Sequence, residues 1–84
     1  METVEITLPS GEITTNAVLM SYAVNGSAYC ALIMLQDNGE PYPIDAVLYA
    51  VEKDKDGDYK LYEIEDENEY DAAARAFDLL QKRL

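Results

Sequence analysis

Residues Ala17 to Leu35 read AVLMSYAVNGSAYCALIML, a stretch of sequence without a single charged side chain. At its centre lies Asn25-Gly26, the strongest short signal for a two-residue type I′ turn between antiparallel strands. With that turn, Val24 pairs with Ser27, and the residues farther from the turn pair in order. The stretch therefore predicts a β-hairpin, and the apolar character of this hairpin decides what the rest of the fold must supply.

Both faces of the hairpin are uncharged, although an antiparallel hairpin with one face in water shows polar residues at every second position. The expected register pairs Tyr22 with Tyr29 and Val18 with Ile33. One face then holds Val18, Met20, Tyr22, Val24, Tyr29, Ala31, Ile33 and Leu35, and the other holds Ala17, Leu19, Ser21, Ala23, Ala28, Cys30, Leu32 and Met34. Each face therefore needs cover.

Five strands are expected in all, at about residues 3–8, 13–24, 27–36, 44–53 and 59–64. Their β-branched and alternating apolar residues are typical of strands, and short polar turns separate them. Pro41 and Pro43 exclude a central strand from the loop between the third and fourth segments, because proline donates no ladder hydrogen bond. Turns this short predict an antiparallel sheet, since parallel strands need long crossover connections.

After the fifth strand the apolar period changes from two to three or four residues, which predicts a helix over about residues 67–83. Asp66 is placed to cap its first turn, with Glu69 three residues later as in a capping box. The apolar stripe of the helix consists of Tyr70, Ala73, Ala74, Phe77, Leu80 and Leu84. Residues 1–84 therefore form one α+β domain, a mainly antiparallel five-stranded sheet with the C-terminal helix packed on one face.

This helix, about 25 Å long at a rise of about 1.5 Å per residue, covers only one face of the central hairpin. Two arrangements cover the other face. Either the sheet curls strongly over itself, or two chains form a homodimer through the uncharged hairpin Ala17 to Leu35. Exposed apolar patches of this size are rare on monomers, which favours the homodimer.

Charge excludes several classes of function before any motif is considered. Seventeen acidic side chains against six basic ones give a net charge of -11, which opposes binding to nucleic-acid phosphates and to anionic membranes. The chain has no His and one Cys, so a Ser-His-Asp triad, a His-ligated zinc site and an intrachain disulfide are impossible. No catalytic residue and no cofactor is predicted.

The turn after the fourth strand resembles a calcium-binding loop in part. Acids occupy loop positions one, three, five and twelve, at Asp54, Asp56, Asp58 and Glu65. Position six of such a loop requires Gly, but Tyr59 stands there. We therefore expect a solvated polar turn and no metal site, with these four acids as weak candidates only.

Two other groups of side chains have structural explanations. Cys30 lies among apolar residues of the third strand, with no base nearby in the sequence to lower the pKa of its thiol, so it is expected to be buried and inert. The acids from Glu63 to Asp71 lie at the expected start of the helix, where the helix dipole stabilises negative charge in water. Neither group predicts catalysis.

Several short motifs follow one another along the chain in a characteristic order. They are Ile6-Thr7-Leu8, Gly11, Tyr22, Gly26, Tyr29, Asp56-Gly57, Ile64-Glu65-Asp66-Glu67, Tyr70 and Ala76-Phe77. In this order they resemble a family of small acidic bacterial proteins catalogued as domain of unknown function 1292. The resemblance implies a cytoplasmic bacterial protein and no biochemical activity. The chain departs from the family in its central hairpin, which lacks the charges that members usually carry there.

The composition predicts a non-enzymatic protein–protein interaction module that binds the basic surface of a partner protein. Two alternatives remain: a carboxylate-based metal-dependent enzyme, and an acidic mimic of nucleic-acid charge. We expect a cytoplasmic location, because Glu2 and Glu5 stand where a secretion signal needs bases. The unbroken apolar run Ala28 to Leu35 is also far shorter than the roughly 20 residues that cross a bilayer.

Overall fold

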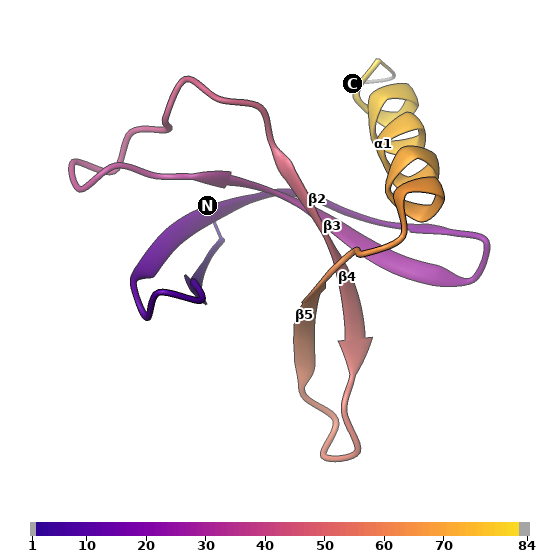
Figure 1. Cartoon of the computed structure of the whole chain (residues 1–84). Helices are drawn as coiled ribbons and strands as arrows, with labels where there is room; N and C mark the ends of the chain where they lie inside the picture. Colours follow the sequence, from indigo (N-terminus) through magenta and orange to yellow (C-terminus); the bar gives the residue numbers. More distant parts are fainter. Residues whose placement is uncertain (1, 83–84) are drawn as a thin grey trace.

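The computed structural model describes residues 2–82, which form one sheet and one helix (Figure 1). The elements are β1 (Thr3–Thr7), β2 (Ile13–Val24), β3 (Ser27–Met34), β4 (Val47–Lys53), β5 (Tyr59–Glu63) and α1 (Glu67–Gln81). Neighbouring strands pair antiparallel in the order β1-β2-β3-β4-β5. The predicted α+β class, the five-stranded antiparallel sheet and the C-terminal helix are therefore confirmed.

The largest errors in the predicted strand bounds lie between β3 and β4. The third strand ends at Met34, not near residue 36, and the fourth begins at Val47, not near residue 44. Residues between them fold into a small hairpin of their own, in which the Tyr42 N–H donates to the Met34 carbonyl at 3.0 Å. The strands β1 and β5 each end one residue earlier than predicted. The last predicted residues of the helix, Arg83 and Leu84, lie outside the described residues.

The turn at the centre of the sequence has the predicted geometry. Asn25 and Gly26 have φ angles of 51° and 83°, the left-handed values that a type I′ turn demands at both positions. The backbone twist of this turn matches the twist of the flanking strands, so β2 and β3 continue directly from it. Val24 pairs with Ser27 as expected.

Farther from the turn the predicted register is wrong. Val18 pairs with Leu32 and not with Ile33, because the register shifts between Val18 and Met20. A β-bulge of this kind leaves an extra residue, here Leu19, outside the ladder and increases the local bend of the strand. The alternation of faces therefore changes at the bulge. Val18 joins the face that carries Leu32, and Leu19 becomes 47% exposed.

The helix begins where the capping signal predicts. Asp66 has extended backbone angles, and its Oδ1 accepts hydrogen bonds from the N–H groups of Asn68 at 2.8 Å and Glu69 at 3.3 Å. These bonds satisfy two of the N–H groups that a helix start leaves without partners. The cap thus sets the point at which the chain leaves β5 and turns back over the sheet.

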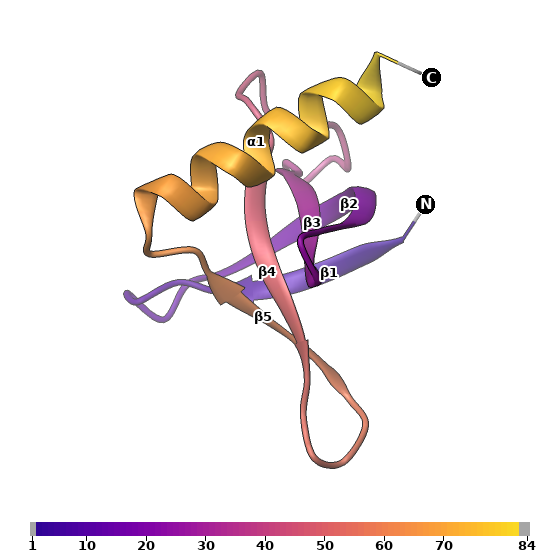
Figure 2. The ribbon, with the colours of Figure 1, turned by 90° about the vertical axis from the view of Figure 1, so that its right-hand side faces the viewer.

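The helix packs on one face of the sheet, where it crosses the upper end of β4 (Figure 2). The core beneath it consists of Tyr29, Ala31, Leu48 and Ala73, with Tyr22, Val24, Ala46, Ala50, Ile64, Tyr70, Ala74 and Phe77 packed around them. Tyr22 ties the two layers together. Its ring stacks on Phe77 with centroids 6.2 Å apart, and its hydroxyl donates to the Ala73 carbonyl at 2.7 Å. Four residues of the predicted helical stripe therefore face the sheet, namely Tyr70, Ala73, Ala74 and Phe77.

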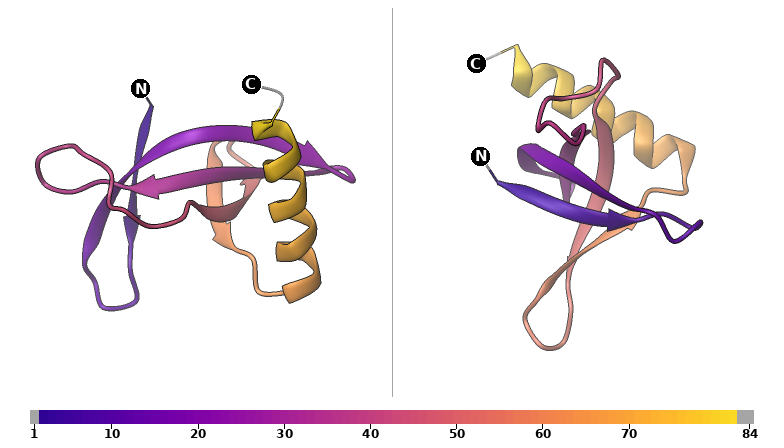
Figure 3. Two further views of the ribbon diagram at one scale, coloured as in Figure 1. Left: turned by 90° about the horizontal axis from the view of Figure 1, so that it is seen from above. Right: turned by 90° about the vertical axis from the view of Figure 1, so that its left-hand side faces the viewer.

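The opposite face of the sheet is covered by curvature. The β1–β2 and β4–β5 hairpins both bend away from the helix, so that the sheet forms a half-barrel (Figures 1 and 3). On its concave side Leu32 is 1% exposed and Cys30 3%. The curled sheet was one of the two arrangements predicted for this face. Within the described residues, no helix is long and apolar enough to cross a membrane.

The hydroxyl of Tyr22 offers a test of the contact between sheet and helix. The substitution Tyr22→Phe removes only the bond to Ala73, so it should lower the free energy of unfolding by about 1 kcal/mol, the usual net value of a hydrogen bond. Burial, aided by the negative charge that Cys30 would carry, raises the pKa of Tyr22 to about 12. The folded state therefore disfavours the ionised phenolate. The protonated Tyr22 side chain therefore contributes its full stabilisation below pH about 10, and this contribution is lost as the pH rises from about 10 to about 12.

Urea unfolding measured across this pH range checks both effects. Tyr22→Phe should flatten the loss of stability at alkaline pH, whereas Tyr59→Phe, at a side chain that is 72% exposed, should leave it unchanged. Equal pH profiles for wild type and Tyr22→Phe would show that Tyr22 does not govern the alkaline transition.

The homodimer through Ala17 to Leu35 remains a prediction, although curling now supplies cover for one face of the hairpin. Equilibrium sedimentation at micromolar concentration should give twice the chain mass of 9.4 kDa. The variants Met20→Lys and Met34→Lys test the two faces in turn, because Met20 pairs with Ala31 and Met34 with Asn16, on opposite sides of the sheet. A mass of 9.4 kDa at every concentration would exclude the dimer and leave the curled monomer.

Candidate functional site

A groove of about 670 Å³ lies between the C-terminal half of α1 and the sheet. We call it the helix groove. Its apolar lining comes from elements that are far apart in the chain, including Leu19 of β2, Ile44 of the segment before β4, and Phe77 of α1. Leu19 is 47% exposed and Ile44 51%. Large aliphatic side chains that remain this open in a hollow are typical of surfaces that bind a partner.

The β-bulge explains why the groove lies where it does. The helix covers the part of the sheet around Tyr29 and Leu48, which belong to the core. At the bulge β2 departs from the regular ladder, and Leu19 and Ile33 of this region line the groove beside the helix. The site does not follow from the sequence, because regular alternation places Leu19 on the opposite face of the hairpin and the predicted fourth strand includes Ile44.

Charged side chains lie along the groove. Asp45 and Asp78 contribute carboxylates from opposite walls, and Arg75 contributes the one basic side chain of the lining. Arg75 is already paired, since its Nη2 lies 3.0 Å from Asp71 Oδ2. The groove therefore combines an apolar floor with a rim that favours positive charge on the bound molecule.

A second hollow, of about 370 Å³, lies inside the curl of the sheet, and we call it the concave hollow. Val4 of β1 and Leu61 of β5 lie on its two sides, with Leu32 and Cys30 of β3 between them. Cys30 is buried, as predicted. Burial, with a smaller effect of Glu2, raises the pKa of its thiol, so the thiol stays protonated and is not a nucleophile at neutral pH.

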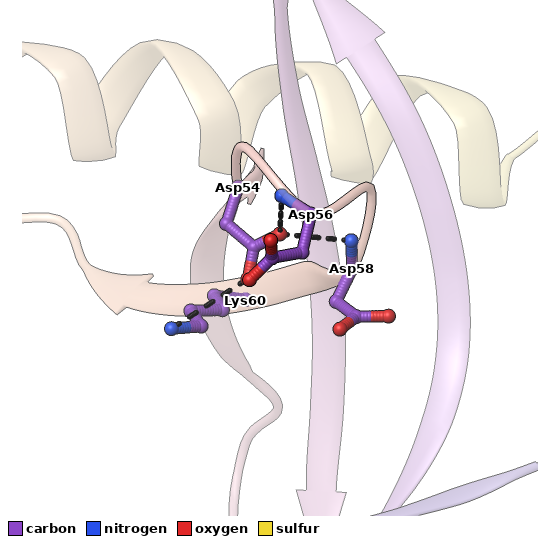
Figure 4. Close-up of polar contacts among 4 residues, drawn as sticks. All are labelled: Asp54, Asp56, Asp58 and Lys60. Atoms are coloured by element: carbon purple, nitrogen blue, oxygen red, sulfur yellow. Dashed lines mark hydrogen bonds and ion pairs between the residues drawn. The ribbon is translucent and has the colours of Figure 1, made fainter.

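The turn between β4 and β5 holds three of the four weak metal candidates, and its polar contacts are internal (Figure 4). Asp54 Oδ1 accepts hydrogen bonds from the N–H groups of Asp56 and Asp58, both at 2.9 Å. Asp54 Oδ2 lies 3.6 Å from Lys60 Nζ. Gly57 has a φ angle of 89°, which closes the turn with an N–H bond to the Asp54 carbonyl. Asp54 thus acts as a turn-forming aspartate.

The fourth candidate does not join this turn. Glu65 follows β5 on the way to α1, so the extended strand carries it roughly 20 Å from Asp58 at about 3.3 Å per residue. Within residues 2–82 no group of three or more Asp, Glu or Cys side chains is arranged to hold a metal ion.

Acids at the start of the helix serve the fold. Asp66 caps the helix, and Asp71 pairs with Arg75. Glu69 accepts a hydrogen bond of 2.7 Å from the Tyr29 hydroxyl. This bond, with burial, raises the pKa of Tyr29. Asp66 and Glu69 therefore stabilise the junction between sheet and helix, whereas Asp71 makes its ion pair within the helix.

Few of the acids have basic partners, which makes stability depend on ionic strength. In the described part of the chain the ion pairs are Lys60–Asp54 and Arg75–Asp71, against a net charge of -11. Mutual repulsion of the remaining carboxylates opposes the compact state. At about 0.5 M NaCl the screening length falls to about 4 Å, so the melting temperature at neutral pH should rise.

Thermal melts at low and high salt measure this effect. The same pair of melts near the isoelectric point of about 4.1 is the control, because the net charge then vanishes and the salt effect should shrink. A melting temperature that stays constant or falls with salt at neutral pH would contradict the expected repulsion.

Comparison with known proteins assigns a family and no activity. Neither the curated proteins nor the solved structures contain a match to the chain. A family model described as a protein of unknown function, DUF1292, matches residues 10–81, which span β2 to the end of α1 and include both hollows except for the β1 wall. The resemblance seen in the sequence motifs is thereby confirmed, and the chain belongs to the DUF1292 family.

Proposed function

We propose that this chain is a non-enzymatic protein–protein interaction module whose helix groove binds the basic surface of a partner protein. The observation that carries the proposal is the pairing of exposed Leu19 and Ile44 with the rim carboxylates of Asp45 and Asp78. An apolar anchor of the partner would fill the groove, while Lys or Arg beside that anchor would meet the rim. Such a centre supplies affinity, and the charged rim supplies specificity.

The charge of the whole protein supports the same proposal. A net charge of -11 on 84 residues creates a field that attracts a basic partner and speeds encounter, and salt weakens this attraction. A bacterial cytoplasm is the proposed location. The unpaired thiol of Cys30 fits a reducing compartment, where free cysteines persist.

Two other functions make different use of the acids. A carboxylate-based metal-dependent enzyme needs clustered ligands, whereas the Asp54 carboxylate is engaged by its own turn. A melting temperature raised by several degrees at micromolar Mn²⁺, Mg²⁺ or Ca²⁺ would favour that enzyme. A mimic of nucleic-acid charge needs only the acidic field, so its partner would be a nucleic-acid-binding protein that DNA displaces.

The side chain of Ile44 gives the sharpest test of the groove. The variant Ile44→Ser removes apolar surface that is 51% exposed, so it should not unfold the protein. Ile13→Ser is the matched control, because Ile13 is 60% exposed and does not line the helix groove. Binding of a basic partner should weaken about tenfold in Ile44→Ser, as expected when an isoleucine anchor is lost, and should not change in Ile13→Ser.

Affinity capture from bacterial lysate at low and high salt supplies the partner, and titration calorimetry with the purified partner then measures the dissociation constants. Wild type and Ile13→Ser should retain the same basic protein at low salt and release it at high salt. Equal retention by Ile44→Ser would contradict the groove as the binding site. Displacement of the captured protein by DNA would instead favour mimicry of nucleic-acid charge.

A further inference from the structure

The two outer strands of the sheet, β1 and β5, each have one neighbour within residues 2–82. The direction of the backbone groups of β5 follows from its ladder. The Asp54 N–H bonds to the Asp58 carbonyl at 2.8 Å, and hydrogen-bonded pairs then alternate along β4 and β5. Lys60 and Tyr62 therefore turn their N–H and C=O groups toward β4. Tyr59, Leu61 and Glu63 turn theirs outward, to the open edge.

This open edge borders the concave hollow. Tyr59 and Leu61 of β5 line the hollow from one side and Val4 of β1 from the other. A strand added beside β5 would place every second side chain on the concave side of the sheet, because side chains alternate along a strand. Those side chains would extend the apolar lining toward β1.

The side chains of β5 also suit an added strand better than those of β1. Tyr59 is 72% exposed and Tyr62 46%, and they lie on opposite faces of β5. Aromatic residues on an edge strand form the cross-strand pairs that stabilise sheets. On β1, by the same alternation, the residues with outward backbone groups are Thr3, Glu5 and Thr7, which offer no exposed aromatic ring.

The charge around β5 indicates which kind of molecule would pair with its open edge. The stretch from Glu52 to Asp71, which contains β5, holds ten acids and three bases and carries -7 of the total charge. A second copy of this chain, paired through the same edge, would bring its own stretch Glu52 to Asp71 of charge -7 beside the first, and the like charges would repel. A strand from a basic protein would be attracted instead.

We propose that the open edge of β5 binds an extended segment of a basic partner protein by strand addition. The segment alternates apolar residues, which project into the concave hollow, with Lys or Arg. Backbone groups of Tyr59, Leu61 and Glu63 make the hydrogen bonds, as in other cases of strand addition. This surface is distinct from the helix groove, so either site can fail its test without the other.

The probe is a peptide of about nine residues that alternates Val and Lys, long enough to form one strand. Amide hydrogen exchange followed by NMR is the readout. The peptide should slow exchange of the Leu61 and Glu63 amides about tenfold, and leave the already bonded Lys60 and Tyr62 amides unchanged. The same peptide with N-methyl groups at alternate Val residues, on its hydrogen-bonding edge, should bind about tenfold more weakly, because it lacks those donors.

A pair of variants tests the edge from the protein side. Glu63→Pro removes an outward N–H donor at the end of β5, and Glu63→Ala removes the same charge but keeps the donor. The peptide should bind Glu63→Pro several-fold more weakly than Glu63→Ala. If Glu63→Pro does not fold, the N-methylated peptide decides the question with wild type alone. Ile44→Ser should bind the peptide as wild type does.

Three results would overturn the proposal. The first is peptide binding without slower exchange at Leu61 and Glu63, and the second is equal binding of the N-methylated peptide. The third is protection of these amides in the free protein that grows with protein concentration, since a second copy would then occupy the edge.

Discussion

Both faces of β3 must be kept from water, and the rest of the structure follows from that requirement. Ala31 and Leu32 are neighbours in the chain and point to opposite sides of the sheet, yet they are 0% and 1% exposed. A strand at the surface of a two-layer protein hides one side only. Here the helix covers the side of Ala31, and the curl of the sheet covers the side of Leu32, which lines the concave hollow. A chain of 84 residues thus builds two apolar layers from a single sheet.

The bulge at Leu19 links this burial to the candidate site. An extra residue in β2 bends the strand, which helps the sheet to curl around Leu32, and it moves Leu19 out of the regular alternation. The same local irregularity therefore serves the core on the concave side and leaves an apolar groove beside Phe77 on the helix side. The proposed binding surface therefore lies where the β-bulge breaks the regular alternation of β2, and such departures from local sequence rules are common at functional sites.

Charge and apolar surface have separate tasks in this molecule. Three of the acids stabilise the fold through hydrogen bonds: Asp54 forms a turn, Asp66 caps the helix and Glu69 accepts a hydrogen bond from Tyr29. The remaining acids stay in water, where they favour a partner of opposite sign. Contacts of the exposed apolar residues would then determine how long such a partner stays bound, because charge acts mainly on encounter.

Local structural features could be predicted from the sequence, since each of them depends on residues only a few positions apart. The Asn25-Gly26 turn, the Asp66 cap and the stripe through Ala73 and Phe77 are such features, and so is the α+β class to which they add up. The bulge at Leu19 could not be predicted, because the side chains of an evenly apolar strand fit either register equally well until both faces of the sheet are packed. The helix groove and the concave hollow depend on the same packing, which joins Leu19 to Ile44 and Val4 to Leu61. The sequence by itself determined the elements and their charge. Tertiary structure alone decided which apolar side chains stay exposed, because that depends on how far one helix and one bend can cover a sheet.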